Sequence, residues 1–210
     1  MADKLDYKKE YKDLYLPGRK PMLIEVPEMR FFMMDGQGEP GGAQYQAALQ
    51  ALYALSFTIK MSKMGGNPPD GYFEYVVPPL EGLWSSPTGV FDLSCPREEW
   101  LWTSMIRQPE FVTEEVFRWA VAECRRKKPE VDVSGVRFEA LEEGLCVQMM
   151  HVGPYSDEPA SLNNMHAFMH ENGYSLWNDE AHRHHEIYLS DPRRTVPERL
   201  KTVLRLPVTK

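Results

Sequence analysis

Two short stretches of the chain follow the same pattern: residues 32–36 read Phe-Met-Met-Asp-Gly, and residues 148–153 read Gln-Met-Met-His-Val-Gly. Each stretch ends an apolar run that is typical of a strand, and a segment with apolar side chains at helical spacing follows each of them. A second pair, Tyr-Phe-Glu-Tyr-Val at 72–76 and His-His-Glu-Ile-Tyr at 184–188, takes the matching place after each helical segment. The sequence therefore predicts an α+β fold with a duplicated strand–helix–strand–strand repeat.

The two repeats divide most of the chain between them. We expect repeat one at about residues 21–110 and repeat two at about 131–210, in a single module that covers 21–210. Residues 1–20 are polar and are interpreted as an N-terminal arm. The predicted elements are, in chain order, an extended segment at 22–34, a helix at 45–60, strands at 72–77 and about 99–107, a strand at 145–152, a helix from about 159 to 173, and strands at 184–189 and 203–208.

A further helix is predicted between the repeats, at about residues 113–128. Glu114 and Glu115 would lie in its first turn and the basic run 125–128 in its last turn, which matches the helix dipole at both ends. We therefore interpret the basic run as a helix end in preference to a phosphate site.

The composition indicates an ordinary globular protein whose charge is unfavourable for nucleic acid. The chain has 210 residues, of which 42% are hydrophobic, and a formal net charge of −7, whereas nucleic-acid binding depends on Lys and Arg. No run approaches about 18 consecutive apolar residues, so we expect no transmembrane helix and no membrane partner. The first residues lack the apolar centre of a signal peptide, and three cysteines without close spacing argue against a disulfide framework. These features predict a reduced, cytoplasmic protein.

The most conspicuous cofactor motif does not fit its mechanism. Residues 36–41, Gly-Gln-Gly-Glu-Pro-Gly, match the G-x-G-x-x-G pattern of dinucleotide-binding loops. Such a loop needs free backbone N–H groups and positive potential at the helix start. Here Glu39 adds negative charge and Pro40 removes a donor, so the pattern argues against a bound dinucleotide.

Metal and covalent chemistry lack supporting motifs as well. The six histidines include a cluster at 182–185, but no H-E-x-x-H and no paired-cysteine motif accompanies it. No G-x-S-x-G is present to mark a nucleophilic serine. We therefore expect no metal and no cofactor.

A glutamate among aromatic residues is the remaining candidate site. Glu186 would lie in mid-strand with His184 and Tyr188 on its own face, and burying a carboxylate is costly unless something compensates. Glu74 is its counterpart in repeat one. The aromatic residues that could surround such a carboxylate are Trp100, Trp102, Tyr155 and Tyr53. Aromatic faces attract cations and flat rings, but ordinary core tryptophans with a solvated glutamate fit the pattern equally well.

Four stretches of the sequence resemble a known family. They read Tyr-Val-Val-Pro-Pro-Leu-Glu-Gly-Leu-Trp at 75–84, Met-Ile-Arg-Gln-Pro-Glu-Phe at 105–111, Gly-Leu-Cys-Val-Gln at 144–148 with Gly-Pro-Tyr at 153–155, and His-Glu-Ile-Tyr-Leu-Ser-Asp-Pro-Arg-Arg at 185–194. With them the chain resembles the GyrI-like small-molecule-binding proteins over about residues 6–210. The resemblance implies two repeats related by pseudo-two-fold symmetry, with a ligand cleft between them.

The resemblance also implies an activity. Stand-alone members of this type are similar to cyclopropanoid cyclopropyl hydrolases, which use an aromatic cage to open DNA-alkylating compounds of the yatakemycin and duocarmycin kind. The family's central glutamate maps onto Glu186, which we expect to orient or deprotonate the attacking water, while Tyr155 hydrogen-bonds the ligand carbonyl. The expected ligand-binding residues are Trp100, Trp102, Tyr53, Glu74, Trp84, Phe168, His184 and Tyr188.

Two alternatives stay open from the sequence. The same cleft would serve a protein that sequesters bulky, flat, lipophilic or cationic xenobiotics without turnover. Kinship within the family also allows a gyrase-inhibitor-like modulator that binds a protein partner.

Overall fold

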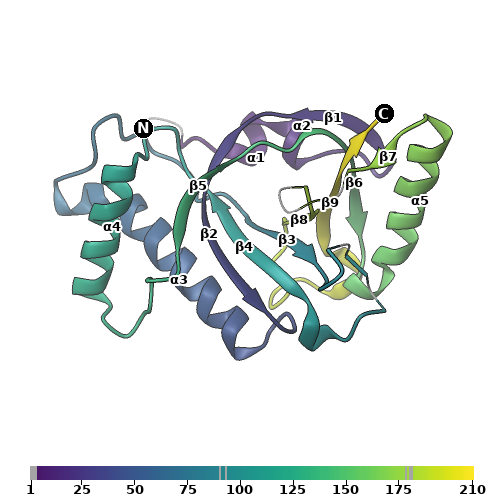
Figure 1. Cartoon of the computed structure of the whole chain (residues 1–210). Helices are drawn as coiled ribbons and strands as arrows, with labels where there is room; N and C mark the ends of the chain where they lie inside the picture. Colours follow the sequence, from purple (N-terminus) through teal and green to yellow (C-terminus); the bar gives the residue numbers. More distant parts are fainter. Residues whose placement is uncertain (1–3, 90, 93, 178, 180–181) are drawn as a thin grey trace.

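The structure is a computed structural model that describes residues 4–89, 91–92, 94–177, 179 and 182–210. Its centre is a curled antiparallel sheet in the strand order β1-β6-β9-β8-β3-β4-β2-β5, with β7 paired to β9 (Figure 1). The strands are β1 (Met22–Val26), β2 (Met29–Gln37), β3 (Leu80–Ser85), β4 (Leu101–Arg107), β5 (Arg137–Leu141), β6 (Gly144–Val152), β7 (Ser175–Leu176), β8 (His184–Tyr188) and β9 (Lys201–Thr209). The α+β class is confirmed.

The helices are distributed over both ends and one side of the sheet (Figure 1). They are α1 (Tyr7–Glu10), α2 (Lys12–Tyr15), α3 (Ala43–Lys60), α4 (Glu114–Lys127) and α5 (Glu158–Glu171), with 3-10 turns η1 (Ser62–Gly65), η2 (Arg97–Glu99), η3 (Tyr155–Asp157) and η4 (Pro197–Arg199). The predicted helices therefore form, with ends shifted by one to two residues.

Both halves of the chain run through the same order of elements. The first half is β2-α3-β3-β4 and the second is β6-α5-β8-β9. The third element of each half, β3 and β8, pair antiparallel at the middle of the sheet, with Gly82 opposite Glu186. That the two halves descend from one duplicated unit stays a prediction.

One predicted strand of the first half is wrong. Residues 72–77 form no strand and make only a single bridge between Tyr75 and Leu5, whereas the strand that pairs with β8 is β3, at Leu80–Ser85. The β3 sequence contains Gly82 and the buried Glu81, which are both unfavourable for a strand by propensity. Because the strand was placed too early, Glu74 is not the counterpart of Glu186.

One further strand prediction is corrected, and two strands were not expected. The extended segment at 22–34 is two strands, because the chain breaks at Pro27 and then pairs with different partners: β1 with β6, and β2 with β4 and β5. Strands β5 and β7 were not expected from the sequence.

Helices α3 and α5 cover opposite ends of one face of the sheet, which we call the helix face. Helix α3 packs on β2 and β4, and α5 on β6 and β7. Leu204, which pairs with Glu186, belongs to the apolar cluster beneath α5 that contains Met165. Glu186 therefore points to the helix face, and strands β3 and β8 lie between the two covered ends (Figure 1).

The other face of the sheet buries a charged network under the N-terminal arm. His185 lies between two carboxylates, with Nε2 2.9 Å from Glu81 Oε2 and Nδ1 2.9 Å from Glu143 Oε1. Arg205 donates to Glu143 Oε2 at 2.9 Å and to the Leu14 carbonyl in α2 at 2.9 Å. The network thus ties β3, β8, β9 and the arm together.

The charges of this network shift the pKa values of its members. Burial would lower the pKa of His185, but the carboxylates of Glu143 and Glu81 outweigh it and raise the pKa to about 9. Burial would raise the pKa of Glu143, but His185 and Arg205 lower it to about 2. Both shifts favour a protonated His185 beside an ionised Glu143.

Candidate functional site

Glu186 lies at the centre of the helix face and is held by hydrogen bonds to both of its oxygens. Nε2 of His184 lies 3.0 Å from Oε1, and the Tyr188 hydroxyl donates to Oε2 at 2.8 Å. The Trp84 indole N–H in turn donates to the Tyr188 oxygen at 2.9 Å. Side chains alternate between the two faces of a strand, so His184, Glu186 and Tyr188 of β8 lie on one face. Glu186 is only 6% exposed.

A glycine opposite Glu186 makes room for this arrangement. A Cβ atom on Gly82 would lie 3.0 Å from Trp84 Nε1 and 3.2 Å from the Tyr188 hydroxyl oxygen. Those two atoms are the ones joined by the hydrogen bond described above. A side chain at this position would therefore push apart the groups that hold Glu186.

Four buried aromatic side chains pack beside Glu186 and form what we call the aromatic cluster: Tyr45, Trp84, Trp100 and Trp102. The ring of Tyr45, from the first turn of α3, lies 5.1 Å from that of Trp102 and 6.0 Å from that of Trp84. Trp84 and Trp100 meet edge to face at 5.8 Å. Such arrangements are favourable for aromatic pairs and present ring edges and faces next to a carboxylate.

Gly36 has a packing role in this cluster. It pairs with Trp102 across β2 and β4, and a Cβ atom on it would lie 2.2 Å from the Trp102 ring. The ring can cross β2 only where a glycine stands. The first glycine of the G-x-G-x-x-G pattern is therefore explained by the close packing of the Trp102 indole against the backbone of β2.

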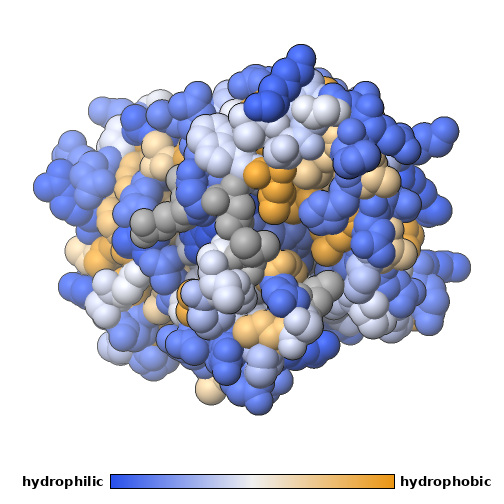
Figure 2. All heavy atoms as spheres, turned by 45° about the vertical axis from the view of Figure 1, so that its right-hand side comes forward, coloured by the Kyte–Doolittle hydropathy of each residue, from blue (hydrophilic) through white to orange (hydrophobic). Residues whose placement is uncertain are grey.

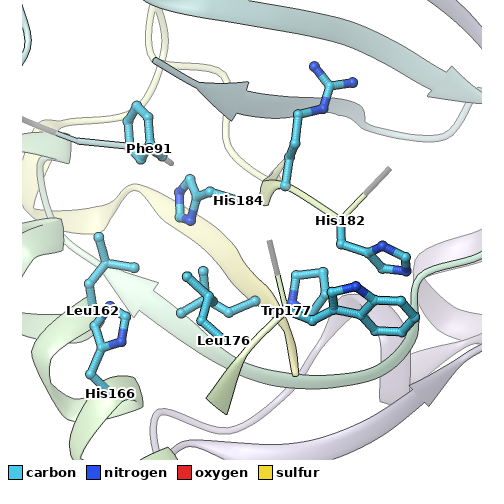
Figure 3. A pocket seen from close by; sticks show the side chains of 10 residues that line it. Phe91, Leu162, His166, Leu176, Trp177, His182 and His184 are labelled. Atoms are coloured by element: carbon cyan, nitrogen blue, oxygen red, sulfur yellow. The ribbon is translucent and has the colours of Figure 1, made fainter. Parts of the chain in front are cut away.

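A small cavity adjoins the site on the side of α5 (Figure 3). It measures about 60 Å³ and is lined by Phe91, Leu162, His166, Leu176, Trp177, His182, Arg183, His184, Leu206 and Pro207. The ring of Phe91 stacks on His184 at 4.8 Å and 7°, and His184 connects the cavity to Glu186 through its hydrogen bond. On this side of the molecule, hydrophobic side chains show among hydrophilic ones (Figure 2).

The turn between β6 and α5 brings one more polar group, Tyr155, to the site. Tyr155 in η3 is 40% exposed, and its ring meets that of Tyr188 edge to face at 6.2 Å. His151 holds the turn in place, with Nδ1 2.9 Å from the Ser161 hydroxyl and Nε2 3.1 Å from the Pro154 carbonyl. Burial, with help from the charges of Glu186 and Glu158, raises the pKa of Tyr155 to about 12, so its hydroxyl remains a donor at neutral pH.

Glu158, the first residue of α5, adds a second carboxyl group. It is 5% exposed, and its Oε1 has no hydrogen-bond partner among the described residues. Burial raises its pKa to about 10, and the nearby charge of Glu186 contributes to the rise. Both effects favour the protonated form of Glu158.

The structure brings together most, but not all, of the residues expected at the site. Trp84, Trp100, Trp102, Tyr155, His184, Glu186 and Tyr188 lie in or beside the aromatic cluster or the Glu186 hydrogen-bond network. Three predicted residues lie elsewhere. Phe168 packs on the apolar cluster beneath α5, and Tyr53 stacks on Phe57 in α3. Glu74 forms ion pairs with Lys60 and Lys63.

Three residues of the site were missed by the sequence analysis: Tyr45, Phe91 and Glu158. Tyr45 lies on the same helix as Tyr53, and helical periodicity alone does not say which turn faces the cluster. Phe91 lies in neither a helix nor a strand, so no periodicity in the sequence indicates where its side chain points. Glu158 precedes Pro159 at a helix start, where an acidic residue normally indicates a solvated side chain that matches the dipole.

Comparison with known proteins identifies the fold and the family. Residues 19–209 match the GyrI-like small molecule binding domain. The chain belongs to this family.

Solved structures agree with that assignment. An uncharacterized conserved protein from Listeria innocua is 57% identical to this GyrI-like chain, with a TM-score of 0.94 over 98% of this chain and 100% of that one. A protein from the same organism that is called a hydrolase is 54% identical, with a TM-score of 0.90 over 98% and 100% of the two chains. The C-terminal domain of EcmrR shares the fold at 13% identity and a TM-score of 0.52, over 91% and 98% of the two chains. No curated protein matches the chain significantly.

The GyrI-like chain has no grouped metal ligands and no membrane helix in its described part. Among these residues, no three or more His, Cys, Asp or Glu side chains are grouped to hold a metal ion. Of the expected histidine cluster, His184 contacts Glu186 and His185 lies on the opposite face, while His182 stacks on Trp177. No helix in the described ranges is long and apolar enough to span a bilayer.

We predict that the stability of this GyrI-like domain falls as the pH rises above neutrality. The folded pKa of His185, about 9, exceeds its unfolded value of 6.5, so its contribution is complete below about pH 6.5 and is lost toward pH 9. Glu158 acts in the same direction, because its pKa rises from 4.5 to about 10 on folding. Urea unfolding at the two ends of this range should show a loss on the order of a few kcal/mol, since one pKa unit corresponds to about 1.4 kcal/mol. Equal or greater stability at the alkaline end would contradict the pKa shift of His185.

Proposed function

We propose that this GyrI-like protein binds bulky, flat, lipophilic or cationic xenobiotics and hydrolyses the cyclopropane of cyclopropanoid DNA-alkylating compounds. The observation that carries the proposal is the buried Glu186 carboxyl group, which has a hydrogen-bond partner on each oxygen and lies beside the aromatic cluster. Solved relatives called hydrolases, at 54% and 55% identity, support a catalytic role.

The reaction requires little of the protein beyond binding and proton transfer. In compounds of the yatakemycin or duocarmycin type, a strained cyclopropane is conjugated to a dienone, and opening it produces an aromatic phenol. Glu186 removes a proton from the water that attacks the ring methylene, and the Tyr155 hydroxyl donates a hydrogen bond to the dienone carbonyl. The aromatic cluster stacks on the ligand and stabilises positive charge at the opening carbon.

Binding such a ligand involves a rearrangement beside His184. Sites for drug-sized ligands usually have volumes of about 300–1,000 Å³, whereas the cavity beside His184 measures about 60 Å³. Phe91 covers the ring of His184, which both lines this cavity and hydrogen-bonds to Glu186. We infer that the ligand displaces the Phe91 ring and takes its place against His184 and Trp100.

The proposal is tested by incubating the purified protein with a yatakemycin- or duocarmycin-type compound. Absorbance follows the conversion of the dienone, mass spectrometry detects the added water, and tryptophan fluorescence reports binding. We expect many turnovers per protein molecule and quenching of the fluorescence. Fluorescence quenching without product would show that the protein binds the compound without hydrolysing it, and would reject the hydrolase function. No response in either measurement would reject both the activity and this ligand class.

A further inference from the structure

Glu158 occupies an unusual place for an acidic residue at the start of a helix. A carboxylate in the first turn gains about 0.3–1 kcal/mol from the helix dipole when it is ionised and solvated. Here the side chain is 5% exposed, and Oε1 finds no partner in the described part of the chain. Burying an ionised carboxylate without donors costs several times more than the dipole returns. The position therefore favours the neutral acid.

The groups that act on Glu158 reinforce this conclusion. Glu186 on β8 adds its negative charge to the effect of burial. The charge of Glu158 in turn acts on Tyr155 in η3 and on Tyr188. The ring of Tyr155, in the turn that leads into Glu158, meets that of Tyr188, and Tyr188 donates to Glu186. The turn that carries Glu158 therefore borders the Glu186 network, and no lysine or arginine among the described residues forms an ion pair with Glu158.

The two carboxyl groups differ in their hydrogen bonds. Glu186 has a hydrogen-bond partner on each oxygen, Nε2 of His184 and the donating hydroxyl of Tyr188, whereas Glu158 Oε1 has none among the residues described. Donors stabilise the anionic form of a carboxyl group. These surroundings favour the proton on Glu158, and pairs of carboxyl groups in different surroundings supply the acid and the base of many hydrolytic sites.

We propose that Glu158 is the proton donor of this site and delivers its proton to the ligand's carbonyl oxygen as the ring opens. The inference rests on the proposed hydrolase function and adds to it a residue with a defined role. Tyr155, the first residue of η3, donates the second hydrogen bond to the same oxygen.

The proton balance of the reaction closes with these two carboxyl groups. The water oxygen forms a bond to the ring methylene carbon, the cyclopropane C–C bond breaks, and its electron pair enters the six-membered ring. The carbonyl oxygen becomes a phenol by accepting the Glu158 proton, while Glu186 takes the proton that the water loses. Transfer of that proton from Glu186 back to Glu158 restores the starting state, and no oxidant or further reactant is needed.

The test compares the wild type, Glu158→Gln and the control Glu171→Gln, which changes an exposed glutamate at the other end of α5. Glutamine matches the shape and neutral charge of a protonated Glu158 but cannot release a proton. We expect kcat for the cyclopropanoid to fall roughly 10²–10⁴-fold in Glu158→Gln, with ligand binding by tryptophan fluorescence changed only a few-fold. The control should match the wild type in both measurements.

An infrared difference spectrum supplies a readout that does not depend on turnover. At neutral pH the wild type and Glu171→Gln should show the carbonyl stretch of a buried, protonated carboxylic acid, and Glu158→Gln should lack it. Absence of this band from the wild type would overturn the inference, and so would unchanged turnover in Glu158→Gln. Those results are distinct from failure of the hydrolase itself, in which the wild type shows the band but no product.

Discussion

Glutamine in place of Glu186 is expected to lower kcat for cyclopropanoid ring opening by roughly 10²–10⁴-fold, the usual contribution of a general base. The amide is similar in size to the carboxylate and can still accept the hydrogen bond from Tyr188, which now reaches Oε2 at 2.8 Å. It cannot take a proton from water. The Kd of the ligand should therefore change much less than kcat, because the aromatic cluster is left intact.

The measurement is single-turnover and steady-state ring opening, followed by absorbance, with tryptophan fluorescence for the Kd. Glu198→Gln is the matched control, because Glu198 is an exposed glutamate in η4. If Glu186→Gln keeps the wild-type kcat, Glu186 takes no part in the chemical step. A loss of binding that accounts for the whole effect would instead make its role one of ligand recognition.

Alanine in place of Glu143 is expected to destabilise the folded protein by about 3–5 kcal/mol, the cost of breaking a buried ion pair by removing one partner. Glu143 accepts hydrogen bonds from His185 and Arg205, each at 2.9 Å. Arg205 is fully buried, so without Glu143 its charge stays inside the protein with fewer acceptors. Because Glu143 raises the pKa of His185, the variant should also lose part of the alkaline decline in stability.

Urea unfolding near pH 6 measures this change directly. The control is Glu142→Ala, because Glu142 precedes Glu143 in the chain and is exposed. This control should alter the free energy of unfolding by no more than about 0.5 kcal/mol, as is usual for surface substitutions. A loss below about 1 kcal/mol in Glu143→Ala would show that Glu81 and Gln148 satisfy the two cations without it. The network would then be redundant.

The sequence alone determined the α+β class, the amphipathic helices and the local surroundings of Glu186. Helical and strand periodicities are local, because the backbone geometry of each element decides which neighbours share a face. The prediction that His184, Glu186 and Tyr188 share one face of a strand needed only that alternation, and the structure joins them by hydrogen bonds.

Only the tertiary structure decided which distant residues meet Glu186. Strand β3 was missed because Gly82 and Glu81 suit their positions only through partners on β8, Trp84 and the buried network. The choice of Tyr45 over Tyr53 depends on how α3 lies across β2 and β4. The burial of Glu158 depends on how α5 and the turn before it pack on β6. Such contacts join segments far apart in the chain, and their register and packing angle leave no periodic trace in the sequence of either segment.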